Sequence, residues 1–312
     1  MSARVLILAA LILQLGLGAC APRKDVAYWK DYQEALRQVG ALRTERNPSE
    51  ITFSNVQFLR NFREIMFYDE YAEEDGKYVL RRTPRLLEKR TSATTYSLTG
   101  ASVQQTDRAQ VAEIARTVSA ASGLDIRRAD KSPDISIFIG THAERVEFAS
   151  FIERIYPDSA LVEELRTDLG ENVCVAIPFY PEDEGQDPSY LILIPGELTG
   201  ILRRACIEEE FGQAFGPAAD FEGARPSIFN DDQEFALFTS HDELLFRVLY
   251  DRRLKPGMSE AEAMPIVERI VAELRPDEPR KLTLGDGEKG GIRITGTSLK
   301  VGSGDDGKSQ RP

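Results

Sequence analysis

"CIEEEFGQAFG", residues 206–216, is the stretch that decides how the fold of this chain is predicted. Glu209 and Gln213 are four positions apart, so on an α-helix both side chains project from one face. Glu210 lies beside them, and Gly216 suits a sharp change of chain direction. The stretch therefore predicts a helix over about 197–215 that brings two carboxylates and an amide together.

In its spacing, E-E-x-x-Q-x-x-G resembles the zinc-peptidase helix H-E-x-x-H-x-x-G, with both histidines replaced. The resemblance places Glu210 where those enzymes carry the general base that activates water. It places Glu209 and Gln213 where they carry the metal-binding histidines, and Asp220 beside the position of a third histidine, Ala219. What the resemblance implies is a pseudo-metal site made of Glu209, Gln213 and Asp220.

A second motif, "PSIFND", follows at residues 226–231. Ser227, Ile228, Phe229 and Asn230 resemble the methionine turn of the metzincins, with Phe229 at the methionine position. Together with "HDELLFRVLYDRRLKPGM", the two motifs resemble a family of bacterial lipoproteins known only as a domain of unknown function. The implied fold is α/β or α+β: a zincin-like mixed β-sheet with a covering helix, the central E-E-x-x-Q helix and a C-terminal helical half.

The residues of this helix are poor ligands for zinc, which prefers imidazole and thiolate. The chain has two histidines, His142 and His241, which are not at helical ligand spacing from each other. Without a strong Lewis acid, a water molecule keeps a pKa of about 15.7 instead of about 7. We therefore expect no metal, no cofactor and no hydrolysis; if the domain is active, Glu210 is the catalytic candidate.

Three interpretations of the helix remain open. In the first, its polar groups hydrogen-bond across the former metal position and tie the helix to the next loop, because buried polar groups need partners. In the second, a peptide-binding cleft survives, with "SYLILIP" as an edge strand that pairs with an extended segment. In the third, oxygens of Glu209, Glu210, Asp220 or Asp231 hold a hard cation such as Ca²⁺. The acidic run Glu208–Glu210 is compatible with a cation, although charge runs usually mark a solvated face.

The N-terminus predicts export and a lipid anchor. "VLILAALILQLGLG" is an apolar stretch of signal-peptide length that follows Arg4. "LGAC", ending at Cys20, resembles the lipobox of bacterial lipoproteins, which implies cleavage after residue 19 and acylation of Cys20 by chains such as palmitate. A plain secretory signal with a chance cysteine is the alternative. By resemblance to Gram-negative lipoprotein sorting, Ala21 favours the periplasmic side of the outer membrane.

Charge restricts the partners. The chain holds 39 basic and 51 acidic residues, and removal of Arg4 with the signal peptide leaves 38 against 51, a net charge of −13. An acidic chain of this kind is a poor ligand for nucleic acid or anionic lipid. The expected partners are the membrane, through the acyl chains on Cys20, and an unidentified envelope protein or peptide.

Cysteine usage agrees with export. Once Cys20 carries lipid, Cys174 and Cys206 remain as an even pair in an oxidising compartment. We expect them to form a disulfide that clamps a strand to the E-E-x-x-Q helix. Two buried free thiols are the alternative.

The chain divides into a signal peptide (1–19), an anchored N-terminal segment (20–49), one domain (50–283) and a disordered tail (284–312). An amphipathic helix is predicted over 25–46, packed on the domain. Within the domain, hydrophobic periodicity and turn signals predict helices and strands. The helices are 54–71, 106–123, 197–215, 240–252 and 259–274, and the strands are 86–100, 133–140, 171–181 and 189–196.

Other candidates have an ordinary explanation beside a functional one. His241 is expected to start a helix that Thr239 or Ser240 caps, with a role facing the E-E-x-x-Q helix as the alternative. His142 is expected at a strand end or in a loop. The basic cluster 81–90, "RRTPRLLEKR", is expected to be a solvated loop, with contact to lipid phosphates or an acidic partner as the alternative.

The sequence thus predicts a lipid-anchored periplasmic protein whose metallopeptidase-like domain is non-catalytic and serves as a binding or structural module. The alternative is an atypical metal-dependent peptidase or cell-wall hydrolase centred on Glu209, Glu210 and Gln213. An assembly or maturation factor is a third possibility.

Overall fold

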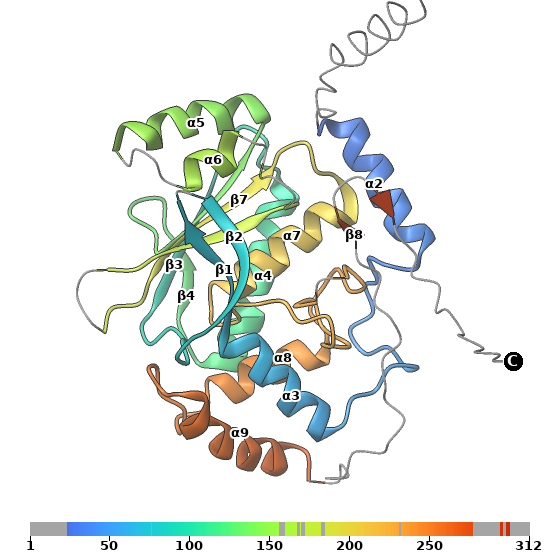
Figure 1. The fold of residues 1–312 in the computed structure, drawn as a ribbon, viewed down its shortest axis with the longest axis vertical. Helices are drawn as coiled ribbons and strands as arrows, with labels where there is room; N and C mark the ends of the chain where they lie inside the picture. The colour runs from blue at the N-terminus through green and yellow to red at the C-terminus, as the bar shows by residue number, and fades with distance from the viewer. Residues whose placement is uncertain are drawn as a thin grey trace, which may run out of the picture.

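The computed structural model describes residues 24–276, together with 294–295 and 298–299, and Figure 1 shows its fold. Gaps within the first range are residues 76, 156–159, 167–168, 170–171, 182–184 and 231. The predicted signal peptide, Cys20 and most of the predicted tail lie outside the described residues. In the tail, the strands β8 (Ile294–Thr295) and β9 (Ser298–Leu299) pair antiparallel.

A five-stranded mixed sheet forms the centre of the fold. Its order is β4-β3-β5-β7-β6, in which β6 is antiparallel to β7 and all other pairs are parallel. The strands are β3 (Thr94–Thr99), β4 (Ile126–Arg128), β5 (Ile135–Gly140), β6 (Val175–Phe179) and β7 (Ser189–Pro195). The predicted mixed sheet is confirmed.

The two faces of the sheet bury different apolar sets, because side chains alternate along each strand. Ile135, Ile137 and Ile139 of β5 lie in the main core. Phe138 packs instead with a smaller cluster that includes Leu193 of β7. Helices α4 (Gln105–Ser122) and α7 (Gly200–Gln213), which contact each other, supply residues to the main core. Two further helices, α5 (His142–Ile155) and α6 (Ala160–Arg166), cover the smaller cluster (Figure 1).

The helices α5 (His142–Ile155) and α6 (Ala160–Arg166) were not predicted. On α5 the fully buried positions include Arg145 and Ala149, whereas Val146 and Phe151 are exposed. Its inner face carries Phe148, Ala149 and Ile152, which pack in the smaller cluster. The buried Arg145 on that face and the exposed Val146 and Phe151 on the other obscure this stripe in the sequence.

The helix predicted over 54–71 is too long. Its observed form, α3 (Asn55–Met66), is followed by an antiparallel hairpin of β1 (Tyr68–Glu74) and β2 (Lys77–Pro84). Ser54 and Gln57 form a capping box at the start of α3. Residues 68–71 pair with β2 instead of continuing the helix, so tertiary pairing overrides the local helical pattern.

The strand predicted over 86–100 is also too long, since only Thr94–Thr99 joins the sheet. Residues before it are held elsewhere: the Leu87 N–H donates to the Met258 carbonyl, and the Gly257 N–H donates to the Leu87 carbonyl. These backbone groups are thereby satisfied by the loop before α9 (Glu260–Leu274) and not by a neighbouring strand.

The N-terminal helix α2 (Val26–Gln38) ends before the predicted residue 46. The Asp25 side chain caps its start by accepting from the Tyr28 N–H. Trp29 and Leu36 are buried in the main core, which confirms that the helix packs on the domain. Leu42 lies beyond the helix, with φ 58°.

The C-terminal half is helical, as predicted, with α8 (Ser240–Leu249) and α9 following the central helix. The predicted helix over 106–123 is α4, and Gly123 ends it with φ 78°. Its capping box joins Gln104 to Asp107. Among the residues that the structure describes, no helix combines the length and apolar character needed to cross a bilayer.

Candidate functional site

The E-E-x-x-Q helix is α7, and its acidic run is largely buried. Glu209 and Glu210 are 6% and 5% exposed, and Glu208 and Gln213 are half-buried. The general expectation that a charge run marks a solvated face is therefore wrong here.

At the other end of α7, the Gln33 side chain of α2 accepts a hydrogen bond from the Leu202 N–H at 3.0 Å.

Glu210, the candidate general base, contacts an edge of the sheet. Its carboxyl accepts a hydrogen bond from the backbone N–H of Ala176 on β6. Burial raises the pKa of Glu210 well above its ordinary value, and the negative charges of Asp220 and Glu70 raise it further. The protonated, neutral form of Glu210 is thereby favoured.

Gln213 ties α7 to the loop that follows. Its Nε2 donates to Asp220 Oδ1 at 3.5 Å, the outer limit of a hydrogen bond. Gly216 turns the chain with φ 137°, at a point where a Cβ would lie 2.5 Å from Leu249 Cδ2. The loop is then held by the Ile65 carbonyl of α3, which accepts from two consecutive N–H groups, those of Ala218 and Ala219. Ala219, at the third-histidine position, is fully buried.

Glu208 has a structural role that the sequence analysis did not assign. Its Oε1 accepts from the Phe238 N–H at 2.7 Å, and its Oε2 accepts from Gln110 Nε2 of α4 at 3.4 Å. Burial raises the pKa of Glu208 although both hydrogen bonds oppose the change. Glu208 thus links α7 to α4 and to the segment before α8.

The turn Ser227–Asn230 is fixed by Asp242 in the first turn of α8. Asp242 is fully buried. One carboxylate oxygen accepts from Ser227 Oγ, and the other accepts from the Ile228 N–H at 3.2 Å. The Thr239 N–H and hydroxyl donate to the second oxygen at 2.7 and 2.9 Å. This role of Asp242 was not predicted.

Phe229, at the methionine-like position, is fully buried between other rings. Its centroid is 6.0 Å from that of Phe238 and 6.3 Å from that of Phe246. A Cβ on Gly212 of α7 would come within 3.2 Å of Phe229 Cζ. The turn therefore packs directly against the E-E-x-x-Q helix.

The two histidines lie in separate environments. His241 is fully buried, with its Nε2 3.1 Å from Asn61 Nδ2 and its ring against Phe53 and Phe58. Its N–H donates to Thr239 Oγ1, which confirms the predicted helix start. His142 starts α5, and its N–H donates to Glu197 Oε1 at 2.7 Å.

The basic cluster 81–90 is neutralised within the fold. Arg81 pairs with an acidic residue of β1, and Arg82 pairs with one of α3. Arg85 pairs with Asp69 and Glu88. Lys89 donates to two backbone carbonyls, and the buried Arg90 donates to Thr94 Oγ1. These contacts leave the cluster poorly suited to lipid phosphates.

Cys174 and Cys206 form the predicted disulfide, with Cα atoms 5.9 Å apart. The bond joins the residue before β6 to the middle of α7. Strand and helix are thus linked covalently, one turn of helix from Glu210.

"SYLILIP" is not an edge strand, so this part of the peptide-cleft interpretation is wrong. It forms β7, which lies between β5 and β6. The edge strands of this sheet are β4 and β6. On β6, the Ala176 N–H is taken by Glu210, and Pro178 has no N–H to donate.

Within the described part of the chain, no group of three or more His, Cys, Asp and Glu residues has the geometry to hold a metal ion. Asp231, one of the proposed Ca²⁺ ligands, lies outside the described residues.

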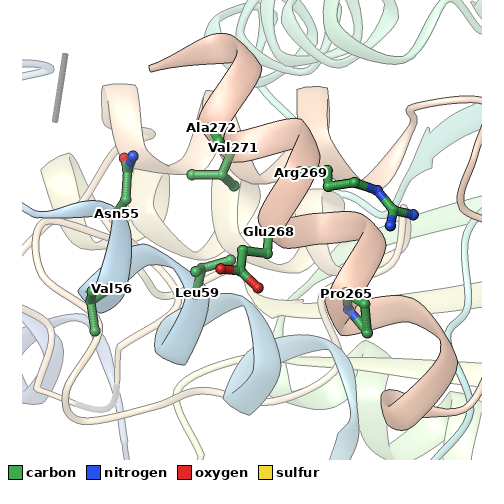
Figure 2. A pocket seen from close by; sticks show the side chains of 8 residues that line it. All are labelled: Asn55, Val56, Leu59, Pro265, Glu268, Arg269, Val271 and Ala272. Carbon is green, nitrogen blue, oxygen red and sulfur yellow. The ribbon is translucent and has the colours of Figure 1, made fainter. Parts of the chain in front are cut away.

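A pocket of about 380 Å³ lies away from this helix, between α3 and α9 (Figure 2). Val56 and Leu59 line it from α3, and Pro265, Glu268 and Arg269 line it from α9. No residue of α7 lines this pocket.

A family model described as a protein of unknown function (DUF2927) matches residues 55–269. The chain belongs to the DUF2927 family. No curated protein matches it.

The DUF2927 match confirms the resemblance to a domain of unknown function. It spans from the start of α3 into α9, so it includes the E-E-x-x-Q helix, the Ser227–Asn230 turn and both cysteines of the disulfide. Residues 24–54, which contain α2, precede the matched region.

Proposed function

We propose that this DUF2927 protein is a lipid-anchored protein of the bacterial envelope, facing the periplasm, whose zincin-like domain is non-catalytic and serves as a structural or binding module. Cys20 carries the lipid, and the outer membrane is the favoured location. The observation that carries the non-catalytic assignment is the state of Glu210: buried, bonded to the Ala176 N–H and with a raised pKa.

The arrangement of elements supports the zincin-like description. The chain passes from strand to covering helix, through further strands of one mixed sheet, and into α7. The Ser227–Asn230 turn then packs against Gly212 of that helix. In this arrangement, hydrogen bonds from Gln213 to Asp220 and from Ala176 to Glu210 take the place of metal coordination.

The alternative, an atypical hydrolase, requires Glu210 to lose its proton and reach a water molecule. The observed burial opposes both steps. It limits contact with water, and ionising a buried carboxyl beside Asp220 and Glu70 is unfavourable. The non-catalytic module is therefore the better-supported function.

Glu210→Gln and Glu210→Ala test the proposal. Gln is neutral and similar in shape, so we expect unchanged or slightly higher stability. Ala leaves the Ala176 N–H without its partner and should lower the free energy of unfolding by about 1–3 kcal/mol. Chelators should leave the melting temperature of the native protein unchanged.

Activity is assayed with casein and isolated peptidoglycan, with and without added zinc. Hydrolysis by the native protein that Glu210→Gln abolishes would overturn the proposal. Equal, background-level signals from both proteins would support it.

A further inference from the structure

The N-terminal segment between the proposed lipid anchor and the matched domain is held firmly in the fold. This segment, residues 24–46, is called the strap below. Trp29 and Leu36 are 3% and 0% exposed in the main core, and Gln33 accepts from the Leu202 N–H of α7. The first part of the strap is therefore fixed by both apolar and polar contacts.

Backbone hydrogen bonds fix the second part of the strap along the segment before α8. The Leu42 N–H donates to Gln233 O at 2.8 Å, and the Arg43 N–H donates to Glu234 O at 2.7 Å. The Ala236 N–H donates to Arg43 O at 2.8 Å. These bonds continue the attachment beyond the end of α2, so the strap is not a flexible linker.

The chain between Cys20 and the strap is short. Three residues separate Cys20 from Lys24, so four residue steps join them. A fully extended chain spans at most about 3.3–3.6 Å per residue, or about 14 Å over this stretch. Acyl chains on Cys20 would enter the bilayer, so Lys24 must lie within about 14 Å of the lipid and Val26, the first residue of α2, within about 21 Å.

The start of α2 and helix α5 lie at the same end of the molecule's longest axis, and α9 lies at the opposite end (Figure 1). The two elements at this end carry exposed apolar side chains. Val26 is 42% exposed, and on α5 Val146 and Phe151 are 38% and 48% exposed. The guanidinium of Arg154 lies 5.8 Å from the Phe151 ring centroid. Exposed apolar groups beside a long cationic side chain suit a lipid interface.

We propose that the strap holds the domain in one orientation at the phospholipid bilayer, with the end formed by α5 and the start of α2 against the lipid and α9 facing away. This inference rests on the proposed lipidation of Cys20. Its consequence is that the pocket between α3 and α9 lies on the side of the domain away from the anchoring membrane.

Energy transfer to labelled lipids tests the orientation. Trp29 is the single tryptophan of the chain, so it can be replaced and the donor moved. The full lipidated protein is reconstituted into phosphatidylethanolamine and phosphatidylglycerol vesicles with dansyl-labelled headgroups. Two double variants are compared: Trp29→Phe with Phe151→Trp, and Trp29→Phe with Leu274→Trp at the end of α9. We expect transfer severalfold stronger from the first.

A tether variant provides the matched control. About 20 Gly/Ser residues inserted between Arg23 and Lys24 add a root-mean-square length of about 25 Å without touching the fold. In this background we expect the two donors to give similar transfer. If the two donor variants without the insertion float with the vesicles and show similar energy transfer, the proposal is overturned.

Flotation and palmitate labelling, with Cys20→Ala as the negative control, test the anchor separately. A native chain without acyl groups overturns the lipid-anchor assignment and this inference together. If the chain is labelled with palmitate and floats, but energy transfer from the two donor positions is equal, only the proposed orientation is overturned.

Discussion

Asp242 shows how much of this fold depends on one buried carboxylate. It accepts four hydrogen bonds from the Ser227–Ile228 turn and from Thr239, two of them from backbone N–H groups. We expect Asp242→Ala to lower the free energy of unfolding by about 3 kcal/mol or more, because several buried donors lose their acceptor. Asp242→Asn keeps one oxygen and should cost less. Urea denaturation measures both, and an Ala variant as stable as the Asn variant would contradict this role.

Asp232 provides a prediction on pH. Burial raises the pKa of this carboxyl from 3.8 to about 6, although its hydrogen bond from the Glu234 N–H opposes the change. Because the folded state holds the proton more tightly than the unfolded chain, the free energy of unfolding falls as pH rises from about 4 to 6.

Asp232→Asn keeps a side-chain oxygen that can accept from the Glu234 N–H and removes the negative charge. It should therefore raise the free energy of unfolding by about 1–2 kcal/mol at pH 8, with little effect near pH 4. Denaturation curves at the two pH values check this. An equal effect at both would show that the carboxyl does not titrate in this range.

At the scale of elements, the disulfide joins the edge strand β6 to α7 across a separation of 32 residues. Closing a loop of that size restricts the unfolded chain and contributes about 3 kcal/mol. Replacing both cysteines (Cys174→Ala with Cys206→Ala) should therefore lower the free energy of unfolding by about that amount, without leaving an unpaired thiol. Hydrogen exchange should accelerate most in β6. Unchanged stability and exchange would argue against the clamp.

For the molecule as a whole, the strap extends the folded unit beyond the matched family region. Trp29 and Leu36 contribute to the main core, and burial of large apolar side chains is worth about 1.5–3 kcal/mol each. A chain that begins at residue 50 should therefore be less stable than one that begins at residue 24 by about 4 kcal/mol or more. Calorimetry of the two purified fragments checks this. Equal melting temperatures would show that the strap is only loosely attached.

The sequence predicted best those elements whose patterns are strong and local. Helices α4, α8 and α9 carry apolar stripes with caps, and β5 alternates apolar residues toward the main core. It failed for α5, where a buried Arg145 lies on the inner face and Phe151 lies outside. Its apolar stripe of Phe148, Ala149 and Ile152 is obscured by these two residues, and the buried Arg145 is explained only by its ion pair with Glu197 from a distant segment.

For the candidate site, the sequence predicted which residues share a helix, but it predicted their burial and hydrogen-bond partners less well. Spacing placed Glu209, Glu210 and Gln213 on one helix, and cysteine counting found the disulfide. Three contacts depend on residues 7 to 34 positions apart that meet only in the folded chain: Gln213 with Asp220, Glu208 with Phe238, and Glu210 with Ala176. The resemblance to the zinc-peptidase helix placed Asp220 with Gln213, but no motif identified Phe238 or Ala176 as partners.

By itself, the sequence determined the composition of the central helix, the absence of histidine from it, and most of the helices and strands of the core. The tertiary structure alone decided that β7 lies inside the sheet with β6 at its edge, and that the acidic run is largely buried. The physical reason is that spacing fixes which side chains share a helix face, whereas burial and hydrogen-bond partners depend on what packs against that face.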